Sequence, residues 1–540
     1  MDNVNQFLQG ARLDGRTAAL LTGAACGAGA LLALVHQVYR HQVAKEKMQR
    51  ARNRRADGLQ RAEEAVLQYK KSRPGTDPAL ILAMSLSELT NSLQEGLLSP
   101  EDVFYSYMEK TLDVNKDLNC CTGILLESFD QLTSVASNKE GLLYGVPVSI
   151  KENYSYKNHD CSCGVVVNLE QPAEKDSVIV EVLKRQGAIP FVKTNLPQAL
   201  LNYDCSNPIY GQSLNPHNLQ KTPGGSSGGE GALVGGGGSL LGFGSDVGGS
   251  IRIPCSFCGI CGLKPTPGRL SSLGIQPIYR GQKSVPSCPG PMARDVDSLA
   301  LAMQALLCDH MFSLDPTVPP IPFNKQIYQS SKPLRIGYLE SDGYTQPSPS
   351  MTRVTFFPLC PLCLGILADG GTISACLCQL PFHLWSRVRK LFGPSGFVAH
   401  ALSVQNLWKQ HAAVEDYIHE TVSEWRRLNI DVLLCPMIGP AFNFDYCGRI
   451  TSVLSYTILY NLLTFPAGVV PVSTVTAEDE EELRHYEGIF KDHWDKLFKQ
   501  AVTGGEGLPV AVQCIALPWQ DELCLRFMKE VEQLVKQSRK

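Results

Sequence analysis

The sequence predicts an α/β protein built around a largely buried sheet, and two observations lead to this prediction. Short runs rich in aliphatic and β-branched residues, bounded by Pro and Gly, recur along the chain. Segments with helical spacing of apolar residues alternate with these runs, which is typical of an α/β fold. The strand-like runs are GVPVSI (145–150), AIPFVKT (188–194), LRIGYL (334–339) and IDVLLCPM (430–437), and the helix between the first two is SVIVEVLKRQG (177–187), which ends at Gly187.

Composition supports a globular chain that is able to bury a large core. Of the 540 residues, 44% are hydrophobic and 19% are charged. This balance resembles neither a disordered chain nor a coiled coil. The net charge of -3 carries no global electrostatic signature of nucleic-acid binding, so no nucleic-acid partner is expected.

The N-terminal part of the chain predicts a membrane anchor. The run Thr17–Val35 is uncharged and about long enough to cross a hydrocarbon core of ~30 Å. A cleaved signal peptide is the alternative, but Asp2 and Asp14 precede the run, which is also long for such a signal. Several Arg and Lys residues follow the run, and by the positive-inside tendency they place the rest of the chain in the cytosol.

After the anchor, helical patterns precede the first predicted strand. They cover ADGLQRAEEAVLQYKK (56–71) and SLSELTNSLQEGLLS (85–99), where Ser85 and Glu88 begin the second helix. We therefore predict the following organisation: an N-terminal tail (1–16), a transmembrane anchor (17–38), a basic and helical linker region (39–95) and a catalytic domain (96–540) that includes an atypical segment (342–405).

The nineteen cysteines are scattered through a chain that does not need a disulfide scaffold, so we expect most of them to be reduced thiols. Two clusters stand out, one formed by Cys255, Cys258 and Cys261 and the other by Cys360, Cys363, Cys376 and Cys378. The first cluster has C-x2-C-x2-C spacing, but Pro265 stands where an iron–sulfur run would have its fourth cysteine. We interpret both clusters as buried small apolar side chains rather than metal ligands.

The segment GGSSGGEGALVGGGGSLLGFGSDVGGS (224–250) carries the candidate catalytic residues. Its glycines let backbone N–H groups approach a ligand, and its interleaved apolar residues distinguish it from a flexible linker. Ser250 is the candidate nucleophile, and the neighbouring amides of Val247, Gly248, Gly249 and Ser250 are candidates for an oxyanion hole. Because a serine hydroxyl needs a base, Lys151 is the candidate base, made neutral by burial, with Ser226 as a proton relay.

A Ser-His-Asp hydrolase is the first alternative, because Gly224–Gly228 matches the pattern G-x-S-x-G. That nucleophile elbow requires an apolar strand directly before it. The segment LQKTPGG precedes it instead, so the sequence context argues against this mechanism.

Six segments of the chain form a recognisable set, and they are GVPVSIKEN, TPGGSSGGEGAL, SDVGGSIRIPCSFCGICGLKPT, GPMARDVDSLAL, FPAGVVPVSTVTAEDEEELRHYEG and LPVAVQCIALPWQDELCLRFM. They resemble the amidase signature family, and within it the membrane-anchored members that hydrolyse fatty-acid amides. The resemblance covers about residues 60–340 and 405–535. It implies a large mixed central sheet surrounded by helices, no cofactor and no metal, a homodimer, and a portal that faces an endoplasmic reticulum or other intracellular membrane.

The resemblance also implies a role for individual residues. Lys151, Ser226 and Ser250 match a Ser-Ser-Lys triad, with a cis peptide bond expected after Gly225. Leu200 and the Val247–Ser250 backbone fall on positions that contact the substrate, and Trp519 matches a residue of the acyl channel. The implied reaction converts N-acylethanolamines, primary fatty amides and also esters to free fatty acids through an acyl-enzyme.

The chain departs from the family between about Ser350 and Leu407, where a Pro- and Cys-rich stretch replaces a longer hydrophobic cap. Within it, LPFHLWSRVRKLF (380–392) combines aromatic and basic residues, which suits either a membrane interface or a surface helix. Two other functions stay open at this point. One is a catalytically impaired, membrane-tethered interaction protein, and the other is an amidotransferase subunit that acts with tRNA.

Overall fold

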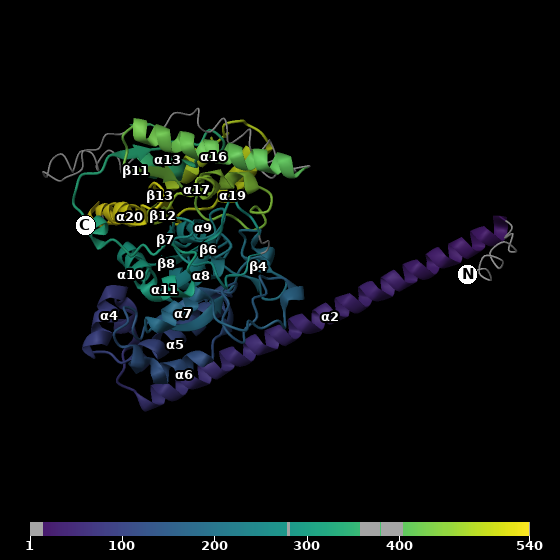
Figure 1. Cartoon of the computed structure of the whole chain (residues 1–540), viewed down its shortest axis with the longest axis horizontal. Coiled ribbons are helices and arrows are strands. Elements are labelled where there is room, and N and C mark those ends of the chain that lie inside the picture. Colours follow the sequence, from purple (N-terminus) through teal and green to yellow (C-terminus); the bar gives the residue numbers. More distant parts are fainter. Residues whose placement is uncertain (1–14, 278–280, 357–377, 380–402, 539–540) are drawn as a thin grey trace. The chain divides into compact units, whose positions relative to one another are not determined.

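The computed structural model describes residues 15–277, 281–356, 378–379 and 403–538 (Figure 1). The chain divides into two compact units, Met1–Asn53 and Arg54–Lys540. The described residues of the first unit belong to helix α2 (Gly15–Ser72), which continues into the second unit. In the parts of the chain that the structure describes, no helix combines the length and the apolar character needed to cross a membrane, so the span predicted for residues 17–38 is not supported.

A mixed sheet of eleven strands, counted within the described residues, forms the centre of the second unit. Its strand labels β11, β13, β12, β7 and β8 follow one another through the body in Figure 1. In sheet order the strands are β1 (Cys121–Ile124), β3 (Ile189–Thr194), β2 (Pro147–Lys151), β6 (Leu241–Asp246), β8 (Cys288–Ala293), β7 (Cys261–Lys264), β12 (Ala467–Thr474), β13 (Pro509–Ile515), β11 (Val432–Pro436), β9 (Ile336–Tyr338) and β10 (Cys378–Gln379). A separate pair joins β4 (Ser206–Asn207) to β5 (Gly211–Gln212).

The predicted α/β fold and the predicted strands are confirmed. The four strand-like runs correspond to β2, β3, β9 and β11, and every residue of β2, β3 and β11 is buried. Strands β3, β2 and β6 run parallel to one another. From β6 to β11 each strand is antiparallel to the next, in the order β6, β8, β7, β12, β13 and β11, and β11 is parallel to β9. Strands covered by helices on both sides bury both sets of side chains, which explains their continuous apolar runs.

Helices surround the sheet, and they include those predicted from apolar spacing. Their bounds are α3 (Pro78–Ala83), α4 (Leu86–Glu95), α5 (Pro100–Leu118), α6 (Glu127–Ser134), α7 (Val178–Arg185), α8 (Gly228–Gly235), α9 (Arg252–Cys258), α10 (Val296–Leu306), α11 (Asp309–Leu314), α12 (Lys325–Tyr328), α13 (Pro349–Phe356), α16 (Val404–Arg427), α17 (Ser455–Leu462), α18 (Ala477–Leu483), α19 (His493–Val502) and α20 (Asp521–Ser538). Short 3-10 turns are η1 (Val135–Asn138), η2 (Val166–Asn168), η3 (Gln198–Leu200) and η4 (Thr451–Leu454).

Local sequence signals explain where two of the predicted helices begin and end. Ser85 and Glu88 form a capping box at the start of α4, in which each side chain bonds the backbone of the other residue. Gly96 ends that helix in the left-handed region at φ 76°. Ser177 caps α7, and Gly187 follows it at φ 79°.

The described cysteines of the core are free thiols. Cys255, Cys258 and Cys261 are buried in α9 and β7, and the thiols of Cys255 and Cys258 donate to the carbonyls of Cys261 and Pro223. Burial raises the pKa of all three thiols well above its usual value. Cys360, Cys363 and Cys376 lie outside the described residues, as do the basic aromatic stretch 380–392 and most of the atypical segment.

Two described helices at the ends of this segment, α13 and α16, pack on the body of the protein. On α13, the Arg353 guanidinium pairs with the Asp479 carboxylate of α18, with Nη2 and Oδ2 2.6 Å apart. On α16, Trp425 is buried and its ring meets Phe465 edge to face. The ends of the atypical segment are therefore anchored in the second unit.

Candidate active site

The parallel strands β2, β3 and β6 end at one edge of the sheet, and this edge carries the candidate catalytic residues. Lys151 is the last residue of β2 and is the register partner of Thr194, the last residue of β3. Strand β6 pairs with β2 at Ser149 and Gly242, and it ends at Asp246. The carboxyl ends of parallel strands in an open α/β sheet are where such folds commonly place their sites.

Lys151 is fully buried, and its ammonium nitrogen has three polar contacts. Nζ donates to Ser226 Oγ at 2.6 Å, to Ser245 Oγ at 3.0 Å and to the Ser245 carbonyl at 3.3 Å. Burial lowers the pKa of Lys151 to about 7, although negative charge on nearby acidic groups acts in the opposite direction. A lysine with this pKa is available as a proton acceptor near neutral pH.

Ser226 lies in a glycine turn that enters α8. Gly224 and Gly225 both have positive φ, at 79° and 63°. A Cβ on Gly225 would lie only 2.4 Å from Pro254 Cδ, so the turn packs against α9 in a way that only glycine permits. The cis peptide bond expected after Gly225 is wrong, because the described residues contain none, and the two left-handed glycines turn the chain instead.

Ser250 lies between β6 and α9 and is partly exposed. Its carbonyl oxygen accepts a hydrogen bond from the Ser227 amide at 3.1 Å, which ties the turn of the predicted relay to that of the predicted nucleophile. Gly249 has φ 122°, and a Cβ there would lie 2.5 Å from Thr457 Oγ1. The turn before Ser250 thus packs tightly against helix α17.

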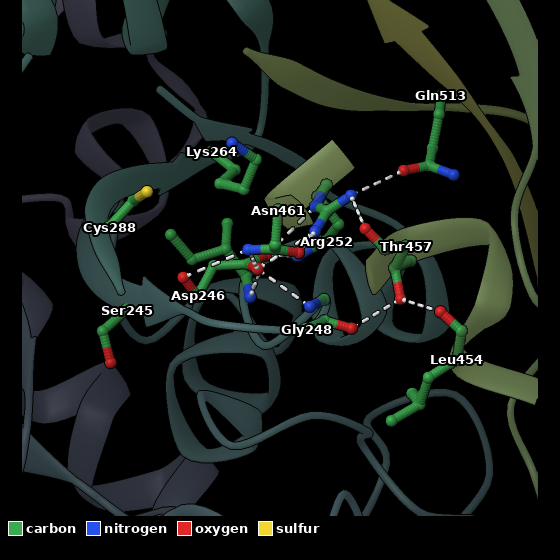
Figure 2. A network of polar contacts seen from close by, with 12 residues as sticks. Ser245, Asp246, Gly248, Arg252, Lys264, Cys288, Leu454, Thr457, Asn461 and Gln513 are labelled. Atoms are coloured by element: carbon green, nitrogen blue, oxygen red, sulfur yellow. Dashed lines mark hydrogen bonds and ion pairs between the residues drawn. The ribbon is translucent and has the colours of Figure 1, made fainter. Parts of the chain in front are cut away.

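The carboxylate of Asp246, at the centre of Figure 2, holds the turn before Ser250 in place. Oδ1 accepts from the Gly249 amide at 2.8 Å, and Oδ2 accepts from the Ile251 amide at 3.1 Å. Arg252 donates to the same carboxylate through Nε at 3.1 Å and Nη2 at 3.0 Å. Burial alone would raise the pKa of Asp246, but the Arg252 charge and these hydrogen bonds hold it well below its usual range.

The Arg252 side chain joins the turn to distant parts of the chain. Figure 2 shows Thr457 and Asn461 of α17 and Gln513 of β13 around the guanidinium. Arg252 Nη1 donates to the Thr457 carbonyl at 2.8 Å and to Gln513 Oε1 at 3.0 Å, and Nη2 donates to Asn461 Oδ1 at 2.5 Å. Every donor of this buried ion pair is therefore directed at an acceptor, which offsets the cost of burying the charges.

The sequence alone does not reveal this network or the contact between Lys151 and Ser245. One signal was present, because Asp246 and Arg252 are charged residues inside an otherwise glycine-rich and apolar segment. A charge in such a segment indicates a partner. Asn461 and Gln513 carried no comparable signal, since they lie 209 and 261 residues away from Arg252 along the chain.

The structure places the predicted substrate-contact residues in other elements. Leu200 ends η3 with φ 57°, directly after Ala199 at φ 59°. Trp519 precedes α20, is 45% exposed, and its backbone amide donates to Thr266 Oγ1 at 2.9 Å. Neither belongs to the hydrogen-bond network of Lys151 and Asp246, and their contact with substrate stays a prediction.

No metal site arises from the described residues, among which no group of three or more His, Cys, Asp or Glu side chains is placed to hold an ion. The chemistry available at this edge consists of hydroxyl groups, one neutralisable lysine, and backbone amides in a glycine-rich turn.

Comparison with known proteins agrees with this chemistry. The Amidase family model matches residues 102–356 and 387–525. The chain is 45% identical to "Fatty-acid amide hydrolase 1" of Sus scrofa, covering 95% of this chain and 96% of the relative. It is 58% identical to "Vitamin D3 hydroxylase-associated protein" of Gallus gallus over 62% of this chain and 72% of the relative.

A solved structure called "Fatty acid amide hydrolase" matches with a TM-score of 0.75 and 25% sequence identity, covering 91% of this chain and 95% of that one. The family match spans most of the sheet together with the turns that carry Lys151, Ser226 and Ser250. The chain therefore belongs to the amidase signature family and is an amidase.

Proposed function

We propose that this amidase hydrolyses fatty-acid amides through an acyl-enzyme formed on Ser250, with Ser226 as proton relay and Lys151 as base and then acid. The observation that carries the proposal is the buried, 2.6 Å contact between Lys151 Nζ and Ser226 Oγ. The depressed pKa of Lys151 supports its role as a base. The Ser250 turn is joined to the Ser226 turn by the Ser227 amide.

The first half of the reaction forms the acyl-enzyme. Ser250 Oγ attacks the amide carbonyl carbon, its proton passes to Ser226, and the Ser226 proton passes to neutral Lys151. The Gly249 amide already donates to Asp246, so the amides of Val247, Gly248 and Ser250 are assigned to the oxyanion. When the tetrahedral intermediate collapses, the proton on Lys151 returns through Ser226 to the leaving amine.

The second half releases the fatty acid. A water molecule replaces the amine and loses a proton through the same Ser226 and Lys151 path while it attacks the acyl carbonyl. Ser250 then leaves with that proton, and the triad returns to its first state. The cycle requires no redox step, because it breaks and forms only acyl C–N, acyl C–O, O–H and N–H bonds.

The substrate class comes from the relatives and from the sequence resemblance. N-acylethanolamines and primary fatty amides are the proposed substrates, and esters are expected to react at the same serine. Leu200 and Trp519 are assigned to the acyl chain. The same proposal includes attachment to an intracellular membrane, a cytosolic catalytic unit and a homodimer.

A serine-reactive fluorophosphonate probe tests the nucleophile, and paired substrates test the chain-length preference. Mass spectrometry is expected to place the adduct on Ser250, and Ser250→Ala is expected to abolish both labelling and turnover. The kcat/KM for oleamide should exceed the kcat/KM for acetamide. An adduct on Ser226 with Ser250 unmodified would refute the assigned roles, and equal rates for the two amides would refute the substrate class.

A further inference from the structure

Ser245 is a buried serine beside the proposed base, and the proposed reaction gives it no role. It precedes Asp246 at the end of β6, and successive side chains of a strand point to opposite faces of the sheet. Asp246 holds the turn before Ser250, whereas the Ser245 hydroxyl lies against Lys151. Figure 2 shows the Ser245 hydroxyl pointing away from the Arg252 guanidinium. The last two residues of β6 therefore serve two different parts of the site.

Ser245 supplies two of the three polar partners of Lys151. Its hydroxyl oxygen lies 3.0 Å from Lys151 Nζ, and its carbonyl oxygen lies 3.3 Å from the same nitrogen. The third partner is Ser226 Oγ at 2.6 Å. A lysine ammonium group has three N–H donors and no acceptor. The ionised form of Lys151 thus has one oxygen acceptor for each of its donors.

The same three oxygens also suit the neutral form of Lys151. A neutral amine keeps two N–H bonds and gains one lone pair. When the two N–H bonds donate to the hydroxyl and carbonyl oxygens of Ser245, the lone pair faces Ser226 Oγ, which is the shortest of the three contacts. In this arrangement Lys151 can accept the Ser226 proton, and both hydrogen bonds to Ser245 are kept when it does.

Other contacts hold Ser245 in this position. Asn153 Nδ2 donates to Ser245 Oγ at 3.4 Å and to the Gln276 carbonyl at 3.1 Å. Ser227 Oγ accepts from the Ser245 amide at 3.3 Å and donates to the Ser245 carbonyl at 3.4 Å. Because Ser227 directly follows Ser226 in the chain, these contacts fix Ser226 and Ser245 relative to each other.

Resting on the proposed function, we propose that Ser245 is a positioning residue that orients the neutral amine of Lys151, so that its lone pair faces the Ser226 hydroxyl. Ser245 itself exchanges no proton during turnover. Without the Ser245 hydroxyl, one N–H bond of the amine loses its acceptor and can donate to Ser226 Oγ instead. An amine that donates to Ser226 does not accept the Ser226 proton through the same contact.

The variant Ser245→Ala tests the orientation, because it removes the hydroxyl oxygen and keeps the carbonyl oxygen. The kcat for oleamide should fall about tenfold, as expected for one lost hydrogen bond. KM should stay unchanged, since the lost contact is made to the base. Ser245→Thr should restore kcat, because threonine keeps a hydroxyl on Cβ and suits a strand. A Ser245→Ala variant with wild-type kcat would overturn the proposal.

Ser239→Ala is the matched control. Ser239 is also a buried serine, lies just before β6, and donates through Oγ to the Leu241 carbonyl at 3.0 Å. Its kcat should equal that of the wild type. An equal fall of kcat in the Ser239 and Ser245 variants would show that the loss of any buried hydroxyl in this region slows the reaction, and would refute a specific role for Ser245.

A direct titration separates this proposal from the hydrolase assignment. The acidic groups that act on Lys151 are all kept in Ser245→Ala, so a change in the lysine pKa would report the lost hydrogen bond; these groups are Cys163, Cys205, Asp246 and Glu230. Loss of an acceptor disfavours the ammonium form and lowers the pKa of a lysine. The titration midpoint of Lys151 should therefore move down by about one pH unit in Ser245→Ala and stay at the wild-type value in Ser245→Thr.

The midpoint is measured by NMR on protein labelled with 13C-lysine, in which the signal of Lys151 is identified by its absence in Lys151→Arg. The shift is expected whether or not Ser250 reacts with the fluorophosphonate probe. Equal midpoints in the wild type and Ser245→Ala would refute the role of Ser245. Failure of Ser250 to react in the wild type, with the midpoint shifted as expected, would refute only the proposed function.

Discussion

At the scale of single residues, Lys151 links burial to chemistry, because the desolvation that lowers its pKa to about 7 is what makes it a base. Below this pH the ammonium form dominates and cannot take the serine proton. Ser250 acylation should therefore increase as pH rises through about 7. The rate of fluorophosphonate labelling between pH 5 and pH 9 measures this increase. A rate that falls across this range would contradict the prediction.

Removing the base should affect the rate far more than the fold. Lys151→Ala is expected to reduce acylation by at least ~10²–10⁴-fold, the usual contribution of a general base. Steady-state kinetics on a fatty amide would measure the loss, with circular dichroism to show that the variant is folded. Near-normal turnover at neutral pH would exclude Lys151 from the reaction.

Asp246 and Arg252 show how a buried charge pair positions a turn. Asp246→Asn should destabilise the protein by ~3–5 kcal/mol, because it leaves the Arg252 guanidinium buried without its counter-charge. Since the folded pKa of Asp246 is depressed, the wild type should lose this stabilisation as pH falls below about 4, the usual pKa of an unfolded aspartate.

Thermal denaturation would measure the difference, and Glu481→Gln serves as control because it breaks an exposed pair with Arg484. Exposed pairs contribute little to stability, so the control midpoint should be close to that of the wild type. Equal midpoints for the Asp246 and Glu481 variants would show that the buried network does not stabilise the fold.

At the scale of elements, the turn into α8 depends on its contact with α9. Gly225→Ala should greatly reduce activity, because the new Cβ would lie 2.4 Å from Pro254 Cδ and displace Ser226. Gly268→Ala is the matched control, since Gly268 also has positive φ but has no atom within 4 Å of an added Cβ.

Both substitutions carry a backbone strain of ~1 kcal/mol, so the comparison isolates the clash. Hydrolysis rates and thermal midpoints of the two variants would be compared. If both variants lost activity to the same extent, the contact between the turn and α9 would have no role in positioning Ser226.

At the scale of the whole molecule, the site belongs entirely to the unit Arg54–Lys540, whereas the predicted membrane attachment is mostly encoded in residues 1–53. Deleting residues 1–38 should therefore reduce co-sedimentation with liposomes and leave Ser250 labelling unchanged. Sedimentation of the full and shortened chains with anionic vesicles would measure the first effect, and probe labelling the second. Equal sedimentation would locate lipid attachment elsewhere, and lost labelling would show that the N-terminal residues support the site.

Sequence patterns predicted the fold class, the strands that end at the site, and the candidate residues Lys151, Ser226 and Ser250. These were accessible because hydrophobic periodicity, helix caps and glycine-rich turns act over short distances along the chain. The apolar run also predicted a transmembrane span at residues 17–38, which no described helix supports. The family resemblance implied a cis bond where Gly224 and Gly225 make the turn through positive φ.

The assembly of these candidates depends on contacts between segments that are distant in the sequence. Gln513 and Asn461 reach Arg252 across more than 200 residues of chain, and the neighbours of Lys151 on β3 and α8 depend on strand order and register. The low pKa of Lys151 depends on complete burial, which no spacing in the sequence reveals. Sequence patterns specify local geometry, whereas burial and electrostatic coupling exist only after distant segments have packed together.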